Sequence, residues 1–178
     1  MLNIRAARGD EYEAVRAFYH SLIDEMQDLP YFPCWEKDVY PTNEYLMYAV
    51  ERGEMYLGEV GDEIAGAMVI RHEPDGNWAK VHWPTRARAG EASVINILCV
   101  HPRFAGRGCA KALVAYALDL ARRRGCRAVR LDVLKGNLPA ENLYRGMGFV
   151  YVDTVRTYYD DADWMDFDLY ECALEVQG

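Results

Sequence analysis

The sequence predicts a single α/β domain over residues 1–178, in which helices cover both faces of a mixed central sheet of about six to seven strands. Three observations support this prediction. A length of 178 residues is typical of one domain. A composition of 51% hydrophobic and 27% charged residues is that of an ordinary globular protein. Segments in which apolar residues recur at three- and four-residue steps alternate with short apolar or half-apolar segments, and together they predict the element order βααβββαβαββ.

The N-terminal part predicts a strand, a helix and an aromatic loop. Residues 3–6 are half apolar and fit a short strand. Apolar side chains then recur at three- and four-residue steps over 12–26, which indicates an amphipathic helix. Prolines interrupt the following stretch, which is rich in aromatic residues over 31–40 and is therefore expected to be a loop.

Thr42 can cap a second helix, which Gly53 would end. Strands over 55–60 and 64–71 are expected to form a hairpin, and residues 73–90 a long loop. Residues 92–100 are expected to form a strand buried on both faces, and residues 106–124 a long helix with an apolar stripe. A strand over 128–134, a short helix over 140–145 and two final strands over 149–155 and 164–175 complete the prediction.

Charge and cysteine content exclude several classes of protein. The chain carries 20 basic and 28 acidic residues, a net charge of −8, which argues against nucleic acid as a partner. No run of about 18 apolar residues predicts a membrane span, and no apolar leader opens the chain. Five cysteines without a C-x-x-C pair favour free thiols in the cytoplasm. The four histidines lack metal-ligand spacing, so no metal is expected.

The segment most informative about chemistry is the turn Arg103-Phe104-Ala105-Gly106-Arg107-Gly108, between the strand ending at Val100 and the long helix. The first amides of a helix have no acceptor within the helix and lie at its positive end, so this turn favours binding of an anionic phosphate. The turn lacks the Lys-Ser/Thr of a nucleotide P-loop. The alternative is an ordinary helix start with glycines for packing.

Arg-x-x-Gly-x-Gly after an apolar strand resembles the pyrophosphate loop of the GNAT superfamily of N-acetyltransferases. The downstream residues Asn137, Ala140, Leu143-Tyr144 and Gly148-Phe149 stand at the spacing of that family, and the match covers residues 95–152. The resemblance implies an enzyme that takes acetyl-CoA as acyl donor and transfers the acyl group directly to an amine.

The resemblance also implies roles for individual residues. The cofactor would be held by Leu98 and Val100 on a free strand edge, by Asn137, by Tyr144 near the sulfur, and by Arg103, Phe104, Ala105, Gly106, Arg107, Gly108, Cys109 and Ala110 around the pyrophosphate. Asn137 can equally be a turn residue and Tyr144 a packing residue.

Tyr144 is the expected general acid for the departing thiolate, and an amide near Val100 would polarise the thioester carbonyl. The general base is less defined. Val94 stands where many relatives carry a carboxylate, so Asn96 is the candidate that would hold a water. Glu91 and His101 lie at the strand ends, and His101 is better explained as a polar turn residue.

The acceptor is expected to be a small-molecule amine. Trp35 and Tyr40 can stack on a cation, and Glu25, Asp28 and Asp38 can attract one, although an aromatic lid packed on the core explains the two rings equally well. The alternatives are a protein N-terminal or lysine acetyltransferase and a non-catalytic acyl-CoA sensor. A homodimer is compatible with this interpretation.

Overall fold

The computed structural model describes residues 2–29, 34–72, 78–159 and 163–175. Across these residues seven strands form one mixed sheet in the order β1-β2-β3-β4-β5-β7-β6, which confirms the predicted fold class. The strands are β1 (Asn3–Ala6), β2 (Met55–Val60), β3 (Glu63–Arg71), β4 (Ala92–Val100), β5 (Ala128–Leu134), β6 (Val150–Tyr159) and β7 (Asp163–Ala173). The helices are α1 (Tyr12–Met26), α2 (Asn43–Glu51), α3 (Cys109–Arg123) and α4 (Leu138–Gly146), with a 3-10 turn, η2 (Pro102–Phe104).

The chain divides into two compact units. The first comprises Met1–Ile70 and Ile97–Leu113, and the second comprises Arg71–Asn96 and Val114–Gly178. Strand β4 and helix α3 each contribute residues to both units. The prediction of one domain over 1–178 stays a prediction, and each unit is described by itself.

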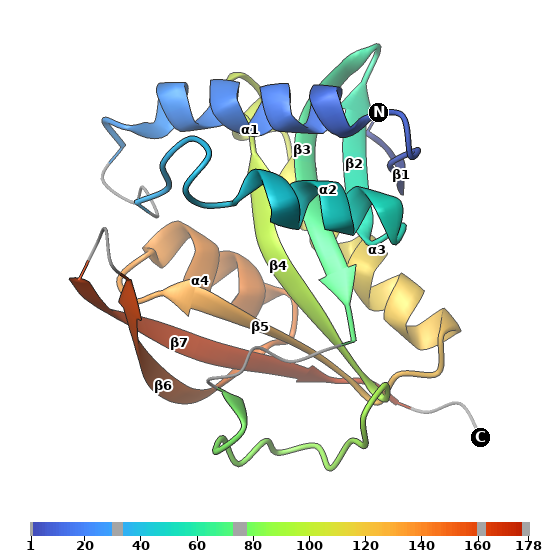
Figure 1. Ribbon diagram of the computed structural model, residues 1–178. Coiled ribbons are helices and arrows are strands. Elements are labelled where there is room, and N and C mark those ends of the chain that lie inside the picture. The colour runs from blue at the N-terminus through green and yellow to red at the C-terminus, as the bar shows by residue number, and fades with distance from the viewer. Residues whose placement is uncertain (1, 30–33, 73–77, 160–162, 176–178) are drawn as a thin grey trace. The chain divides into compact units, whose positions relative to one another are not determined.

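In the first unit, α1 and α2 lie side by side on one face of the antiparallel strands β1, β2 and β3 (Figure 1). Helix α1 buries the apolar stripe that its sequence predicts, including Val15, Tyr19 and Leu22. These side chains pack with Leu57 and Ala67 from the strands. Burial of such a stripe is the main source of stability for a helix of this length.

The start of α3 packs on the opposite face of the same strands. A Cβ atom added to Gly66 would lie 2.9 Å from Cδ1 of Leu113 and 2.8 Å from the carbonyl oxygen of Cys99. Glycine therefore lets β3, β4 and α3 approach closely here. Helices cover both faces of the strands of this unit, as the sequence predicts.

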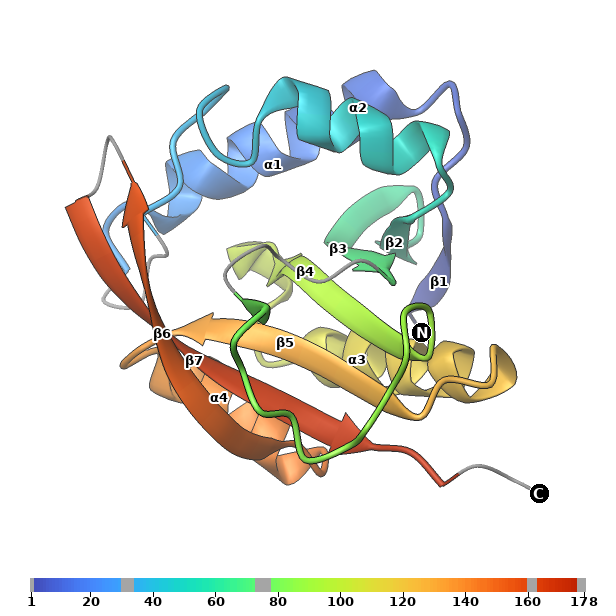
Figure 2. The same cartoon turned by 60° about the horizontal axis from the view of Figure 1, so that its bottom comes forward.

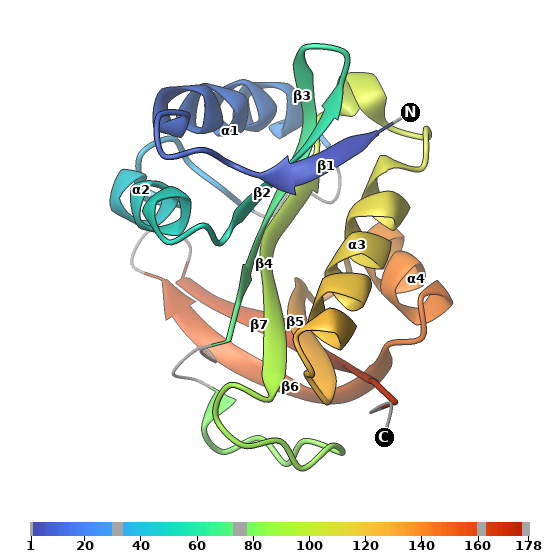
Figure 3. The ribbon, with the colours of Figure 1, turned by 90° about the vertical axis from the view of Figure 1, so that its right-hand side faces the viewer.

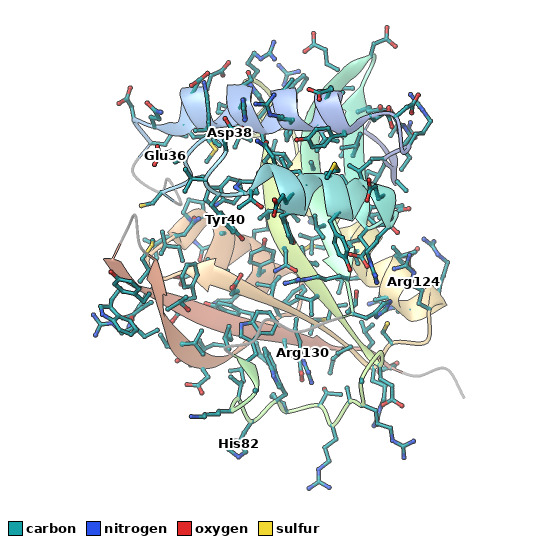
Figure 4. All side chains as sticks on the ribbon, viewed as in Figure 1. Glu36, Asp38, Tyr40, His82, Arg124 and Arg130 are labelled. Carbon is teal, nitrogen blue, oxygen red and sulfur yellow. The ribbon has the colours of Figure 1, made fainter. Side chains whose placement is uncertain are left out.

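In the second unit, α4 covers one face of β5, β7 and β6, and residues 78–91 cross the other face (Figures 2 and 3). That segment is irregular but anchored. The guanidinium of Arg130 donates to Glu171 at 2.9 Å and to the carbonyl of Thr85 at 3.0 Å, and Trp83 stacks on it. Figure 4 labels Arg130 on its strand. Trp78 closes an apolar cluster with Val94 and Leu169 beneath the segment.

Several element ends differ from the prediction. Helix α3 begins at Cys109 rather than at residue 106, because Gly106 and Gly108 have φ angles of 73° and 76°, outside the right-handed helical region. Helix α4 begins at Leu138, before the predicted residue 140, with Pro139 in its first turn. Strand β6 continues to Tyr159, four residues further than predicted. Residues 73–77 of the predicted loop lie outside the described residues.

Candidate active site

The turn between η2 and α3, the predicted phosphate-binding segment, is exposed and has an unusual backbone conformation. Residues 105–108 are exposed, and both glycines hold positive φ angles. Phe104 is buried beside Cys109 and Ala65 and anchors the turn. The guanidinium carbons of Arg103 and Arg107 lie 6.0 and 5.4 Å from the centre of the Phe104 ring. The turn therefore combines exposed backbone with two guanidinium groups that lie near one buried ring.

His101 connects this turn to α1. Its Nδ1 accepts from the backbone N–H of Arg103 at 3.4 Å, so the proton of the neutral ring is on Nε2. Nε2 lies 3.2 Å from Oγ of Ser21 and 3.5 Å from a carboxylate oxygen of Glu25. Burial lowers the pKa of His101 and favours the neutral ring. The geometry supports the interpretation of His101 as a turn residue.

The strand before the turn is distorted at Ile97, which has a φ angle of 43°. A positive φ at a β-branched residue is a genuine outlier. The hydroxyl of the fully buried Tyr19 donates to the carbonyl oxygen of Ile97 at 3.1 Å. Leu98 and Val100, the predicted cofactor-binding residues of this strand, are half-buried. The sequence does not predict this hydrogen bond, because the spacing of Tyr19 in α1 indicates only that its side chain is part of the core.

The parallel pairing of β4 with β5 is short. It joins Ala92–Val94 with Ala128–Arg130 and covers only the first three residues of β4. The pairing therefore ends before the distortion at Ile97.

The cysteines of this region are packing residues. Cys99 is buried, and burial raises the pKa of its thiol to about 12. Cys109 is also buried. A thiol with so high a pKa is a poor nucleophile, so Cys99 is not suited to carry an acyl group.

Asn137 is the N-cap residue of α4, and Tyr144 lies within that helix. The side-chain oxygen of Asn137 accepts from the backbone N–H of Ala140 at 3.2 Å and caps the helix. Its amide group is still a donor that a cofactor arm can use. Tyr144 is 6% exposed, and its ring packs edge-on against Phe149 with centres 5.6 Å apart. Both open interpretations of each residue are thus compatible with its position.

Asn96 is held in place by a neighbouring cation. Nε of Arg71 donates to its side-chain oxygen at 2.8 Å, and the residue is 7% exposed. Its amide group is therefore oriented by Arg71, a contact that no sequence motif signals. Glu91 accepts from the backbone N–H of Arg88 at 2.9 Å, and Val94 is part of the apolar cluster under Trp78.

The predicted acceptor residues Trp35 and Tyr40 are half-buried, with ring centres 6.1 Å apart. Trp35 also packs on Tyr19 at 6.1 Å, and both rings contact the core of the first unit. Tyr31 and Phe32 lie outside the described residues. The segment is therefore packed on the core while part of each ring stays accessible.

Asp38, which is predicted to attract a cationic substrate, is paired with groups of this chain. Its Oδ1 accepts from Nδ2 of Asn43 at 2.7 Å and from Nη2 of Arg16 at 3.1 Å, and it lies 3.2 Å from Nε2 of His20. These bonds lower the pKa of the carboxyl group. Figure 4 labels Asp38 on the segment between α1 and α2. These contacts join the segment to Arg16 of α1 and to Asn43 of α2.

Within the described ranges, no group of three or more His, Cys, Asp or Glu side chains is placed to hold a metal ion. In the same ranges, no helix combines the length and the apolar character needed to cross a membrane.

Curated relatives match parts or most of the chain. An N-alpha-acetyltransferase 30 of Saccharomyces cerevisiae is 38% identical over 65 residues, 36% of this chain and 37% of the relative. This match thus spans only about a third of the yeast protein. An uncharacterized N-acetyltransferase of Bacillus subtilis is 28% identical over 86% of this chain and 84% of its own length. A streptothricin acetyltransferase of Streptomyces lavendulae is 29% identical over 53% of this chain and 50% of its own length.

Solved structures share the fold at low identity. A GNAT acetyltransferase from Streptococcus agalactiae aligns with a TM-score of 0.77 at 15% identity, over 98% of this chain and 96% of that one. One from Streptococcus pneumoniae aligns with a TM-score of 0.74 at 20% identity, over 98% and 100%. A family model described as the acetyltransferase (GNAT) family matches residues 17–149, well over half of the chain. The chain therefore belongs to the GNAT family of N-acetyltransferases.

Proposed function

We propose that this protein transfers the acetyl group of acetyl-CoA to the primary amine of a small molecule, by direct attack in a ternary complex. The observation that carries the proposal is the turn at Gly106 and Gly108. It exposes backbone at the start of a 15-residue helix and holds two guanidinium groups against the Phe104 ring. A diphosphate is the part of acetyl-CoA that such a turn would bind.

In this proposal, the residues named above bind different parts of acetyl-CoA. Residues 103–110 hold the pyrophosphate, and Leu98 and Val100 present strand backbone to the pantetheine arm. Asn137 donates to that arm from the cap of α4. A pantetheine chain lying along a free strand edge would bind as an added strand does.

Tyr144 acts as the general acid. A phenol has a pKa of about 10 and a thiol of about 8.5, so a neutral tyrosine can protonate the departing thiolate at a cost of ~2 kcal/mol. Burial at 6% exposure keeps the phenol away from bulk water. Asn96, oriented by Arg71, would hold a water that passes the ammonium proton of the acceptor on to bulk solvent before the neutral amine attacks the thioester.

The preference for a small acceptor rests on the segment 34–42. It is fixed to α1 by Asp38 and presents Trp35 and Tyr40 as partly accessible rings. Aromatic rings suit the hydrophobic and cationic parts of a small amine. The streptothricin relative is named for a small-molecule acceptor, whereas the yeast relative is named as an N-alpha-acetyltransferase. A protein N-terminus is therefore the second candidate.

The test is a screen of amines with acetyl-CoA, in which free CoA thiol is measured. The panel contains aminoglycoside-like and amino-acid amines and short peptides with free N-termini. Turnover with small amines and none with peptides supports the proposal. Turnover with peptides alone would instead identify a protein N-terminus as the acceptor. Binding of acetyl-CoA without turnover would favour a non-catalytic sensor.

A further inference from the structure

We propose that Tyr19 is a positioning residue for acyl transfer, whose hydroxyl orients and polarises the peptide group between Ile97 and Leu98 so that the Leu98 N–H faces the thioester carbonyl. This inference rests on the proposed function, because it assigns the amide donor of that site. The donor expected from the sequence lies near Val100, and the geometry of β4 favours Leu98.

The first step is the distortion of the strand. Ile97 has a φ angle of 43° in a strand whose other described residues need no such conformation. A left-handed β-branched residue is costly and persists only when its surroundings hold it there. The hydrogen bond from Tyr19 to the Ile97 carbonyl oxygen, at 3.1 Å, supplies that constraint.

The second step follows from the planarity of the peptide bond. The carbonyl of Ile97 and the N–H of Leu98 belong to one trans peptide group, so they point in opposite directions. When Tyr19 fixes the carbonyl toward α1, it also aims the Leu98 N–H away from α1. The tyrosine therefore controls a donor that it does not touch.

The third step is electronic. A hydrogen bond to a carbonyl oxygen draws electron density from the amide nitrogen and makes the N–H a stronger donor. Tyr19 is fully buried, where such a bond is not weakened by water. Burial also raises the pKa of its phenol well above the usual value, so the hydroxyl keeps its proton.

The surroundings of Tyr19 hold its ring still. Phe18 and Trp35 pack against it with centres 5.4 and 6.1 Å away. Because Trp35 is also a proposed acceptor residue, the same tyrosine lies between the acceptor segment and the distorted strand. A fixed phenol fits a positioning role, since an oxyanion donor has to be in place before the charge develops.

The test compares Tyr19→Phe with Tyr12→Phe, a matched change at a half-buried tyrosine of the same helix and cluster. We expect Tyr19→Phe to lower kcat about three- to tenfold, with KM for acetyl-CoA and for the amine changed less than about twofold. The Leu98 amide proton should move upfield in the NMR spectrum. Tyr12→Phe should change neither quantity.

A second variant, with 3-fluorotyrosine at position 19, keeps the shape and makes the phenol a stronger donor. It should raise kcat and move the Leu98 amide proton downfield, a trend that packing alone does not produce. If Tyr19→Phe fails to fold, the changes in kcat and in the Leu98 amide shift of the 3-fluorotyrosine variant still test the role of the hydroxyl.

A wild-type kcat and an unmoved Leu98 amide in Tyr19→Phe would overturn the inference and leave the proposed function intact. If the wild-type protein acetylates no amine, the proposed function fails. The Leu98 amide shift in the unliganded protein then still decides whether Tyr19 polarises this peptide group.

Discussion

Gly108→Ala tests whether the turn before α3 holds the diphosphate. Gly108 has a φ angle of +76°, and an added Cβ atom would have no neighbour within 4 Å. The methyl group therefore meets open space, and the whole cost comes from the backbone conformation. A left-handed L-residue costs roughly 1–2 kcal/mol. For a chain of this size that cost corresponds to a fall in Tm of about 2–8 °C.

The effect on binding follows from how the turn relieves this strain. If the chain rotates Gly108 out of the left-handed region, the following amides no longer converge on one point. One lost hydrogen bond to a charged phosphate costs about 1.5–3 kcal/mol. The Kd for acetyl-CoA, measured by isothermal titration calorimetry, should therefore rise roughly ten- to one-hundredfold.

Gly125→Ala is the matched control. Gly125 follows the other end of α3, has a φ angle of +71°, and an added Cβ atom would again have no neighbour within 4 Å. The Tm of Gly125→Ala should fall as much as that of Gly108→Ala, because both variants carry the same backbone strain. Its Kd for acetyl-CoA should change less than about twofold. Equal Kd values in the two variants would refute the assignment of the diphosphate to this turn.

Three further predictions concern catalysis, packing and pH. Tyr144→Phe should lower kcat roughly tenfold with an unchanged Kd for acetyl-CoA, and an unchanged kcat would reject the acid role. Gly66→Ala places a Cβ atom 2.8 Å from the Cys99 carbonyl, and should cost about 1–3 kcal/mol of unfolding free energy in urea. Hydrogen bonds from Arg5 lower the pKa of Glu11 to about 2 from 4.5, so its stabilisation is complete above pH 4.5 and is lost as pH falls toward 2. Denaturation series at several pH values should show that loss, and Glu11→Gln should flatten it.

The sequence predicts the order of the elements well, because each has a strong local signal. Helix α1 has a complete apolar stripe, and Gly125 follows α3 at a left-handed position as a helix-ending glycine should. The start of α3 has a weaker local signal in the sequence. Glycine fits both a helix and a turn, and only the backbone angles show that Gly106 and Gly108 precede the helix.

The sequence predicts residues of the candidate site only where they belong to one short segment. Residues 103–108 are contiguous, and Asn137 and Tyr144 lie at the cap and within one short helix, so the resemblance to the GNAT family can assign roles to them. Contacts between distant segments leave no such trace. Tyr19 and Ile97 are 78 residues apart in the sequence, and their contact is visible only in the structure. Hydrophobic periodicity assigns both of these side chains to packing, whether or not a hydroxyl also forms a functional bond.

The aromatic segment shows why the two interpretations of Trp35 and Tyr40 are not exclusive. Packing on the core and contact with an acceptor would compete if the segment had to leave the core to bind. Asp38 fixes the segment to Arg16 and Asn43, and Trp35 rests on Tyr19. An acceptor that stacks on the accessible part of rings already held in place pays little ordering entropy. In the proposed function, the packed segment would then itself be the binding surface, and the charge pairs that hold it would contribute to specificity for the acceptor.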